Sequence, residues 1–176
     1  MSLLRITEPD EATGELAEAY QGALDKIGFA PNGYKMFGVS IDVLNRQSSL
    51  MGLVMQHPTL SPRFSAILRL LVSKNRQCDY CVGANSSMLQ NYFDVSAEQI
   101  EAFKQDIETV PLKSREKALL IFVLKATEDT QSTTAADIEA LRNQGWADHE
   151  ILDAMYQGAQ QVAADMLFNT FQVKND

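Results

Sequence analysis

The segment that decides the fold reads LSPRFSAILRLLVSKNRQCDYCVGANSSML, residues 60–89. Ser61 followed by Pro62 is a strong helix-start signal, because proline is well suited to the first helical position. Apolar residues then recur at intervals of three and four on one helical face: Phe64, Ile67, Leu68, Leu71 and Val72. The pattern predicts a helix that ends within residues 74–77, followed by a second helix over about 78–90.

Helical periodicity and capping signals extend over the rest of the chain. We expect Ser96 with Gln99 to form a capping box and Ser114 and Thr134 to act as N-caps. Further helices are expected over about 9–28, 40–57, 96–103, 114–126, 134–145 and 151–166, with at most one short helical turn within 29–39.

The last of these patterns gives the clearest prediction of a buried face. The residues expected on that face are Ile151, Met155, Ala159, Val162 and Met166, which step by three and four along an amphipathic helix. No segment alternates convincingly between apolar and polar residues with period two. The sequence therefore predicts an all-α protein of about seven to eight helices.

Length and charge restrict the class of protein. The 176 residues suit a single domain over 1–176 with a genuine core. A formal net charge of -8 without a basic face argues against nucleic acid and against an anionic membrane surface. We see no secretory signal and no apolar run long enough to cross a bilayer, so we expect a cytoplasmic protein.

Cys78 and Cys81 are the only cysteines, and their CxxC spacing places both on one face of a helix. At a helix N-terminus, the free amide groups and the dipole favour the nucleophilic thiolate. A structural zinc site needs about four ligands, and His57 and His149 are the only histidines. Two small buried residues without chemistry are a second alternative. In a reducing cytosol we favour redox activity, with no metal and no cofactor.

Residues 60–89 resemble the core motif of the carboxymuconolactone decarboxylase family, on its alkylhydroperoxidase D-like (AhpD-like) side. A weaker similarity extends over GFAPNGYKMFGVSIDVL at 28–44 and over 136–173, which ends in MLFNTFQV. The resemblance implies an AhpD-like helical fold, a homo-oligomer (trimer or hexamer), and thiol-dependent reduction of a hydroperoxide substrate. The disulfide formed would be re-reduced by an unidentified thiol or dithiol.

In the peroxidase members of the family, a glutamate precedes the first cysteine by twelve residues and a histidine follows the second by four. The corresponding residues here are Ala66 and Asn85. The resemblance implies that Cys81 attacks the peroxide and that Cys78 resolves the sulfenic acid. Because a positioned acid or base typically contributes about 10²- to 10⁴-fold in rate, the loss of both relay residues is expected to weaken turnover heavily.

Three residues are candidates to support the dithiol. Asn85 lies one helical turn after Cys81 and can donate a hydrogen bond to a thiolate, but an amide cannot move a proton. Tyr80 is either a substitute donor or, as we favour, a packing aromatic. His57 precedes a proline and is either near the dithiol or, as we favour, simply a helix-end residue.

Two other functions remain open. Loss of both relay positions favours a non-catalytic oligomeric scaffold or redox sensor that has kept its cysteines. Lactone decarboxylation, the chemistry of the family's namesake branch, is a weaker alternative, because it needs an acid or base in the pocket and no dithiol.

Overall fold

The computed structural model describes residues 2–176, and every regular element in that range is helical. The elements are α1 (Gly14–Ile27), α2 (Asn32–Phe37), α3 (Ile41–Met55), α4 (Pro62–Asn75), α5 (Asp79–Phe93), α6 (Ala97–Gln105), η1 (Ile107–Thr109), α7 (Ser114–Glu128), η2 (Thr130–Ser132), α8 (Ala135–Asn143) and α9 (Asp148–Thr170). The all-α prediction is confirmed. The described range contains nine α-helices, and the one that was not expected is the six-residue α2. It lies in the stretch where at most one short helical turn was expected.

Several predicted caps are present. Ser61 Oγ accepts a hydrogen bond from the Phe64 amide at 3.1 Å and so begins α4. Ser96 and Gln99 form the expected capping box of α6, and Thr134 caps α8. These helices begin where local side-chain chemistry satisfies their first amide groups.

Other helix ends differ from the prediction. The first helix starts at Gly14 rather than Pro9, because residues 8–11 close a separate turn through the Glu11 amide and the Glu8 carbonyl (3.0 Å). Ser114 is the first residue of α7 and not its N-cap, since Lys113 holds that position and donates its amide to the Glu116 carboxylate (3.1 Å).

The ends of α3 and α5 also differ. The α3 helix ends at Met55, two residues before His57, whose Nδ1 accepts a hydrogen bond from the Leu60 amide (3.0 Å) in the following loop. The α5 helix continues past residue 90 to Phe93, where Asp94 adopts a left-handed conformation (φ 52°) and ends it.

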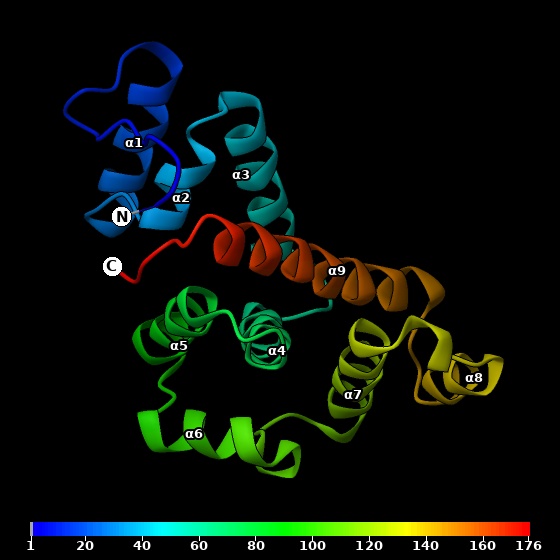
Figure 1. Cartoon of the computed structure of the whole chain (residues 1–176). Helices are drawn as coiled ribbons and strands as arrows, with labels where there is room; N and C mark the ends of the chain where they lie inside the picture. Colours follow the sequence, from blue (N-terminus) through cyan, green and yellow to red (C-terminus); the bar gives the residue numbers. More distant parts are fainter. Residues whose placement is uncertain (1) are drawn as a thin grey trace.

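The α4 helix lies at the centre of the molecule and packs against α5, α7 and α9, while the long α9 crosses above it (Figure 1). Most residues of α4 are buried, including all five predicted on its apolar face. This main core joins α4 to α6, α7, α8 and α9. At Gly158, α9 approaches α7 so closely that an added Cβ would clash with Val123.

A second, smaller core contains both cysteines. Its buried members are Met36, Phe37, Leu44, Cys78, Tyr80, Cys81, Phe168 and Val173. They come from α2, α3, the start of α5, the end of α9 and the C-terminal tail, residues 171–176. Figure 1 shows that tail running from α9 into the space between α2 and α5. The dithiol therefore lies where segments from both ends of the chain meet.

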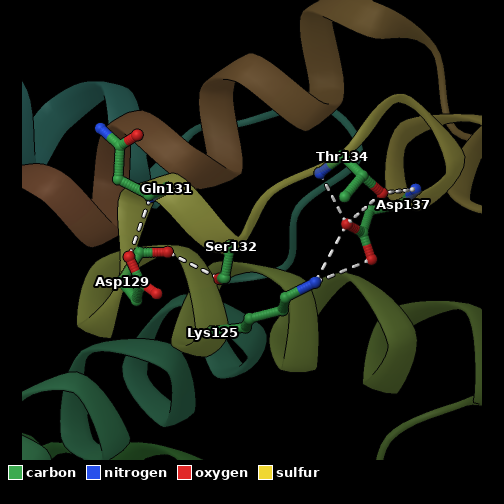
Figure 2. A network of polar contacts seen from close by, with 6 residues as sticks. All are labelled: Lys125, Asp129, Gln131, Ser132, Thr134 and Asp137. Carbon is green, nitrogen blue, oxygen red and sulfur yellow. Dashed lines mark hydrogen bonds and ion pairs between the residues drawn. The ribbon is translucent and has the colours of Figure 1, made fainter.

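A polar network far from the cysteines fixes the turn from α7 to α8 (Figure 2). Both carboxylate oxygens of Asp137 accept hydrogen bonds from Lys125 Nζ at 3.0 Å. The Thr134 amide and hydroxyl also donate to Asp137, each at 2.8 Å. Lys125 first, and Thr134 second, lower the pKa of Asp137 to about 2.

None of the helices within residues 2–176 is long and apolar enough to span a lipid bilayer.

Candidate active site

A tight turn between α4 and α5 places Cys78 at the head of α5. Gln77 adopts a left-handed conformation (φ 54°). The Gln77 amide donates to the Lys74 carbonyl (3.2 Å) and the Cys78 amide donates to the Ser73 carbonyl (3.0 Å). These two bonds form a Schellman motif, which ends α4 and leaves Cys78 as the N-cap of the next helix.

The two thiols lie at the N-terminus of α5, as the spacing predicted. The Cys81 amide donates to Cys78 Sγ at 3.4 Å, so Cys78 caps the helix through sulfur. Both cysteines are free, and their exposed fractions are only 0% for Cys78 and 3% for Cys81. Amide groups at a helix N-terminus stabilise a thiolate, so this geometry favours negative charge on Cys78.

The electrostatics of the pair are asymmetric. Hydrogen bonding from the Cys81 thiol, helped by the Cys81 amide, lowers the pKa of Cys78 against the opposing effect of burial. The hydrogen bond with Cys78, burial and the nearby Asp165 carboxylate raise the pKa of Cys81. Of the two thiols, Cys78 is therefore the one that ionises more readily. The assignment of Cys81 as the attacking thiol rests on the resemblance alone and stays a prediction.

Sequence reasoning missed Asp165, which reaches the dithiol from α9. Each of Cys78, Cys81 and Asp165 offers a sulfur or carboxylate oxygen that lies within 4.8 Å of those of the other two. The exposed fraction of Asp165 is 1%. Its Oδ1 accepts hydrogen bonds from Ser73 Oγ (2.8 Å) and Gln161 Nε2 (2.9 Å), whereas its Oδ2 has no hydrogen-bond partner in the protein.

The predicted buried face of α9 was wrong at Ala159 and Met166, which are exposed, whereas Val162 packs against the main core. The buried positions in the C-terminal half of the helix are Gln161, Asp165 and Phe168. Hydrophobic periodicity assigned the interior to apolar residues, but the protein buries a polar network along this part of the helix. The available signal was the spacing of four between Gln161 and Asp165, which places both on one face.

The buried network continues from Asp165 to a cation. Gln161 Nε2 also donates to Ser73 Oγ (2.9 Å), and Gln161 Oε1 accepts from Arg69 Nε (2.7 Å). Burial lowers the pKa of the Arg69 guanidinium, and the negative charges of Cys81 and Asp165 oppose that shift. Arg69 and Gln161 also line a small cavity of about 40 Å³ between α3, α4 and α9. A partly buried positive charge thus faces the dithiol and the carboxylate.

The candidate support residues do not contact the sulfurs through the groups expected. Asn85 Nδ2 donates to the Cys81 backbone carbonyl (2.8 Å), and its buried Oδ1 has no partner. Tyr80 stacks edge-on against Phe168 (ring centroids 5.0 Å apart), and its hydroxyl accepts from the Gly33 amide at 2.8 Å.

Neither His57 nor Ala66, which stands at the expected glutamate position, supplies an acid or a base to the dithiol. His57 Nε2 pairs with Asp153 at 3.1 Å, so the structure does not bring this histidine to the dithiol. Ala66 is buried in the main core, where it supplies no acid or base.

The helical fold of this chain is shared by solved structures. A protein from Ralstonia eutropha JMP134, described as an uncharacterized peroxidase-related protein with an alkylhydroperoxidase AhpD core, superposes with a TM-score of 0.88 at 22% sequence identity, over 99% of this chain and 92% of the other. This chain has the AhpD-core fold. The resemblance seen in the sequence is thereby confirmed at the level of the fold.

Two further structures share the AhpD-core fold. An uncharacterized peroxidase-related protein from Silicibacter sp. TM1040 has a TM-score of 0.88 at 20% identity, covering 99% of this chain and 92% of its own. A putative antioxidant defence protein AhpD, of unknown function, from Agrobacterium tumefaciens has a TM-score of 0.65 at 20% identity, with coverages of 78% and 93%. No protein-family model matches the sequence, and no curated protein matches it.

The site brings together three groups of the kinds that can bind a metal ion. Cys78, Cys81 and Asp165 form the one such cluster found within residues 2–176. A closed structural zinc site needs four ligands, and neither His57 nor His149 belongs to this cluster. The donor set is therefore short of a complete zinc site by one ligand.

The C-terminal tail covers the dithiol. Val173 packs into the same small core as the two cysteines. Asp176 accepts hydrogen bonds from the Asn32 amide (2.6 Å) and the Tyr80 hydroxyl (3.4 Å). A cavity of about 280 Å³ lies beside this cover, between the start of α5 and the tail, but neither cysteine lines it. A reagent can reach the sulfurs only after a local opening.

Proposed function

We propose that the protein is a thiol oxidoreductase that reduces hydroperoxides through a reversible disulfide between Cys78 and Cys81. The observation that carries the proposal is the pair of free thiols at the N-terminus of α5, within 4.8 Å of one another and beside a buried carboxylate. The two most similar AhpD-core structures described above are both called peroxidase-related, which supports the same chemistry.

The overall reaction balances without a metal or an organic cofactor. Two thiols and one hydroperoxide give one disulfide, one alcohol and one water, and the O–O bond accepts the two electrons that the sulfurs lose. A thiol or dithiol reductant of the cell then returns the disulfide to two thiols by exchange. By resemblance, Cys81 attacks and Cys78 resolves.

Thiol trapping tests this proposal. Reduced protein is mixed with about one equivalent of hydroperoxide, quenched with an alkylating agent and analysed by mass spectrometry, alongside Cys81→Ser and Cys78→Ser. We expect a Cys78–Cys81 disulfide in the natural chain and a sulfenic acid on the remaining cysteine of whichever variant keeps the attacking thiol. Cysteines that stay reduced until the protein is denatured would refute the proposal.

A redox sensor or scaffold is the second candidate, favoured by the near-complete burial of both thiols. A sensor would form a disulfide that alters assembly or partner binding, but would not turn over with a thiol reductant. Repeated cycling with dithiothreitol and hydroperoxide separates the two functions. The weaker lactone decarboxylase reading is tested by carbon dioxide release from the unsaturated lactone.

We also propose that the protein is a homo-oligomer, as the resemblance implies. Large apolar side chains are exposed on α3 and α9, among them Leu53, Leu152, Tyr156 and Met166. Exposed apolar side chains that gather into a patch are typical of protein–protein interfaces. Light scattering coupled to size-exclusion chromatography gives the number of subunits, and a monomer at micromolar concentration would contradict the proposal.

A further inference from the structure

Thiol oxidation by a hydroperoxide needs proton transfers that the positions expected from the resemblance cannot provide. The departing alkoxide must receive a proton, and the Cys81 thiol must lose one before it can attack. Ala66 has no ionisable group, and the Asn85 amide does not titrate. A group elsewhere in the fold has to carry the proton if the proposed function is correct.

We propose that the carboxyl group of Asp165 is the proton carrier of the dithiol, supplied from α9. This inference rests on the proposed function. The carboxylate lies within 4.8 Å of both sulfurs and is buried, and among the described residues it is the one acid grouped with them. No sequence motif near the cysteines indicates that Asp165 belongs to the site.

The two oxygens of Asp165 are in different situations, which suits a proton carrier. Oδ1 is fixed by two donors, Ser73 Oγ and Gln161 Nε2. Oδ2 is buried and has no hydrogen-bond partner in the protein. A buried carboxylate oxygen without a donor is costly, and such exceptions call for a functional explanation. Oδ2 is free to accept and return a proton while Oδ1 holds the group in position.

A nearby positive charge helps the buried site to hold the Asp165 carboxylate next to a thiolate. The ionisable groups grouped around Asp165 are Cys78 and Cys81 from α5 and Arg69 from α4. Arg69 reaches Asp165 through Gln161, which donates to Asp165 and accepts from Arg69. The positive charge partly offsets a thiolate and a carboxylate that would otherwise repel each other in a desolvated site.

Asp165 takes the proton from Cys81, whose thiolate attacks the distal peroxide oxygen, so that the S–O bond forms and the O–O bond breaks. The electron pair leaves on the alkoxide, which receives the proton from Asp165 and departs as the alcohol. Asp165 then takes the proton of the Cys78 thiol, and the Cys78 thiolate attacks the sulfur of the Cys81 sulfenic acid. The S–S bond forms, the S–O bond breaks, and the departing hydroxide receives that proton from Asp165 and leaves as water.

The deciding experiment compares two reagents on Asp165→Asn, which keeps the shape of the side chain and removes the acid. One reagent is a hydroperoxide, whose alkoxide leaving group needs a proton. The other is methyl methanethiosulfonate, which also reacts with thiolates but releases a stable sulfinate anion that needs none. Asp148→Asn, the same change at an exposed position on α9, is the matched control.

We expect Asp165→Asn to slow disulfide formation by hydroperoxide about 10²- to 10⁴-fold, the usual contribution of a positioned acid or base. Methanethiosulfonate modification is expected to keep its rate or to accelerate, because removal of a negative charge favours the thiolate. Asp148→Asn is expected to match the natural chain with both reagents. Equal slowing with both reagents, or no slowing with the hydroperoxide, would overturn the role of Asp165.

Ser73→Ala gives a second test if Asp165→Asn folds poorly. This change keeps the acid and removes one donor to Oδ1, so the hydroperoxide step is expected to slow about two- to tenfold, the equivalent of one hydrogen bond. An unchanged hydroperoxide rate would contradict the positioning. If the natural chain itself forms no disulfide with hydroperoxide while it reacts with methanethiosulfonate, the proposed function fails and the relay fails with it. If the natural chain forms the disulfide with hydroperoxide and the variants form it at the same rate, the relay alone fails.

Discussion

Ser73 of α4 donates a hydrogen bond of 2.8 Å to Asp165 of α9, and both side chains are buried. The two residues are 92 positions apart in the chain and join the two helices that cross at the centre of the molecule (Figure 1). This contact brings an acid to the dithiol and links the dithiol site to the packing of α4 against α9.

Ser73→Ala is expected to destabilise the protein by about 1–3 kcal/mol, because it leaves a buried carboxylate oxygen with one donor fewer. Urea denaturation followed by circular dichroism measures the change. Ser87→Ala, on the exposed side of α5, is the control and is expected to change stability by no more than about 0.5 kcal/mol. Equal losses of stability in the two variants would show that the Ser73–Asp165 hydrogen bond contributes no more to stability than an exposed serine does.

The two thiols are expected to ionise at well-separated pH values. The pKa of Cys78 is lowered from the ordinary 9.0 and that of Cys81 is raised, so absorbance at 240 nm should show one thiolate appearing below pH 9.0 and the second only well above it. Because a raised folded-state pKa favours the protonated native form, the stability contributed by Cys81 is present below the unfolded thiol pKa and is lost as pH rises through the folded value.

The variants identify which thiol ionises first. In Cys78→Ser the low-pH step is expected to disappear, whereas in Cys81→Ser a thiolate step is expected to remain. A single step of two thiolates near 9.0 in the natural chain would contradict the asymmetry between Cys78 and Cys81.

Val173→Ala is expected to increase the alkylation rate of the native thiols about five- to tenfold. Val173 lies in the same small core as both cysteines, and the loss of its two methyl groups removes about 1–1.5 kcal/mol of burial from the closed tail. The opening equilibrium that exposes the dithiol rises by the corresponding factor. Iodoacetamide labelling followed by mass spectrometry gives the rate. Lys174→Ala changes an exposed neighbour and should leave it unchanged.

Two glycines of helical segments are expected to respond to alanine with opposite signs. Gly158→Ala puts a Cβ into Val123 at the contact of α9 with α7, and we expect a loss of about 1–3 kcal/mol. Gly52 of α3 has open space at its Cβ position, so Gly52→Ala is expected to gain about 0.5–1 kcal/mol from helix propensity. Thermal unfolding of both variants measures the difference, and a loss in Gly52→Ala would contradict the helical environment described for it.

Much of the fold was predictable because the signals are local. The Ser61 cap and the apolar face of α4 are written within one or two helical turns, and the structure confirms both. The start of α5 at the CxxC motif follows from the same segment. The α5 helix ends at Phe93 rather than near residue 90, because the residue that closes it is a left-handed Asp94.

The candidate site was only half predictable. Cys78 and Cys81 are three residues apart, so their common face follows from helix geometry. Asp165 was missed because apolar periodicity placed Met166 inside and gave no reason to bury an acid. His57 was open to a role near the dithiol, yet it pairs with Asp153 instead.

By itself, the amino-acid sequence determined that this protein is all helical and that two cysteines share the first turn of one helix. Both properties depend on interactions between residues three and four apart. Only the tertiary structure decided that Asp165 stands beside those sulfurs, that Ser73 and Gln161 hold it there, and that the C-terminal tail covers the site. Burial of a charge requires partners distant in sequence, and those partners meet only when α4, α5 and α9 pack together.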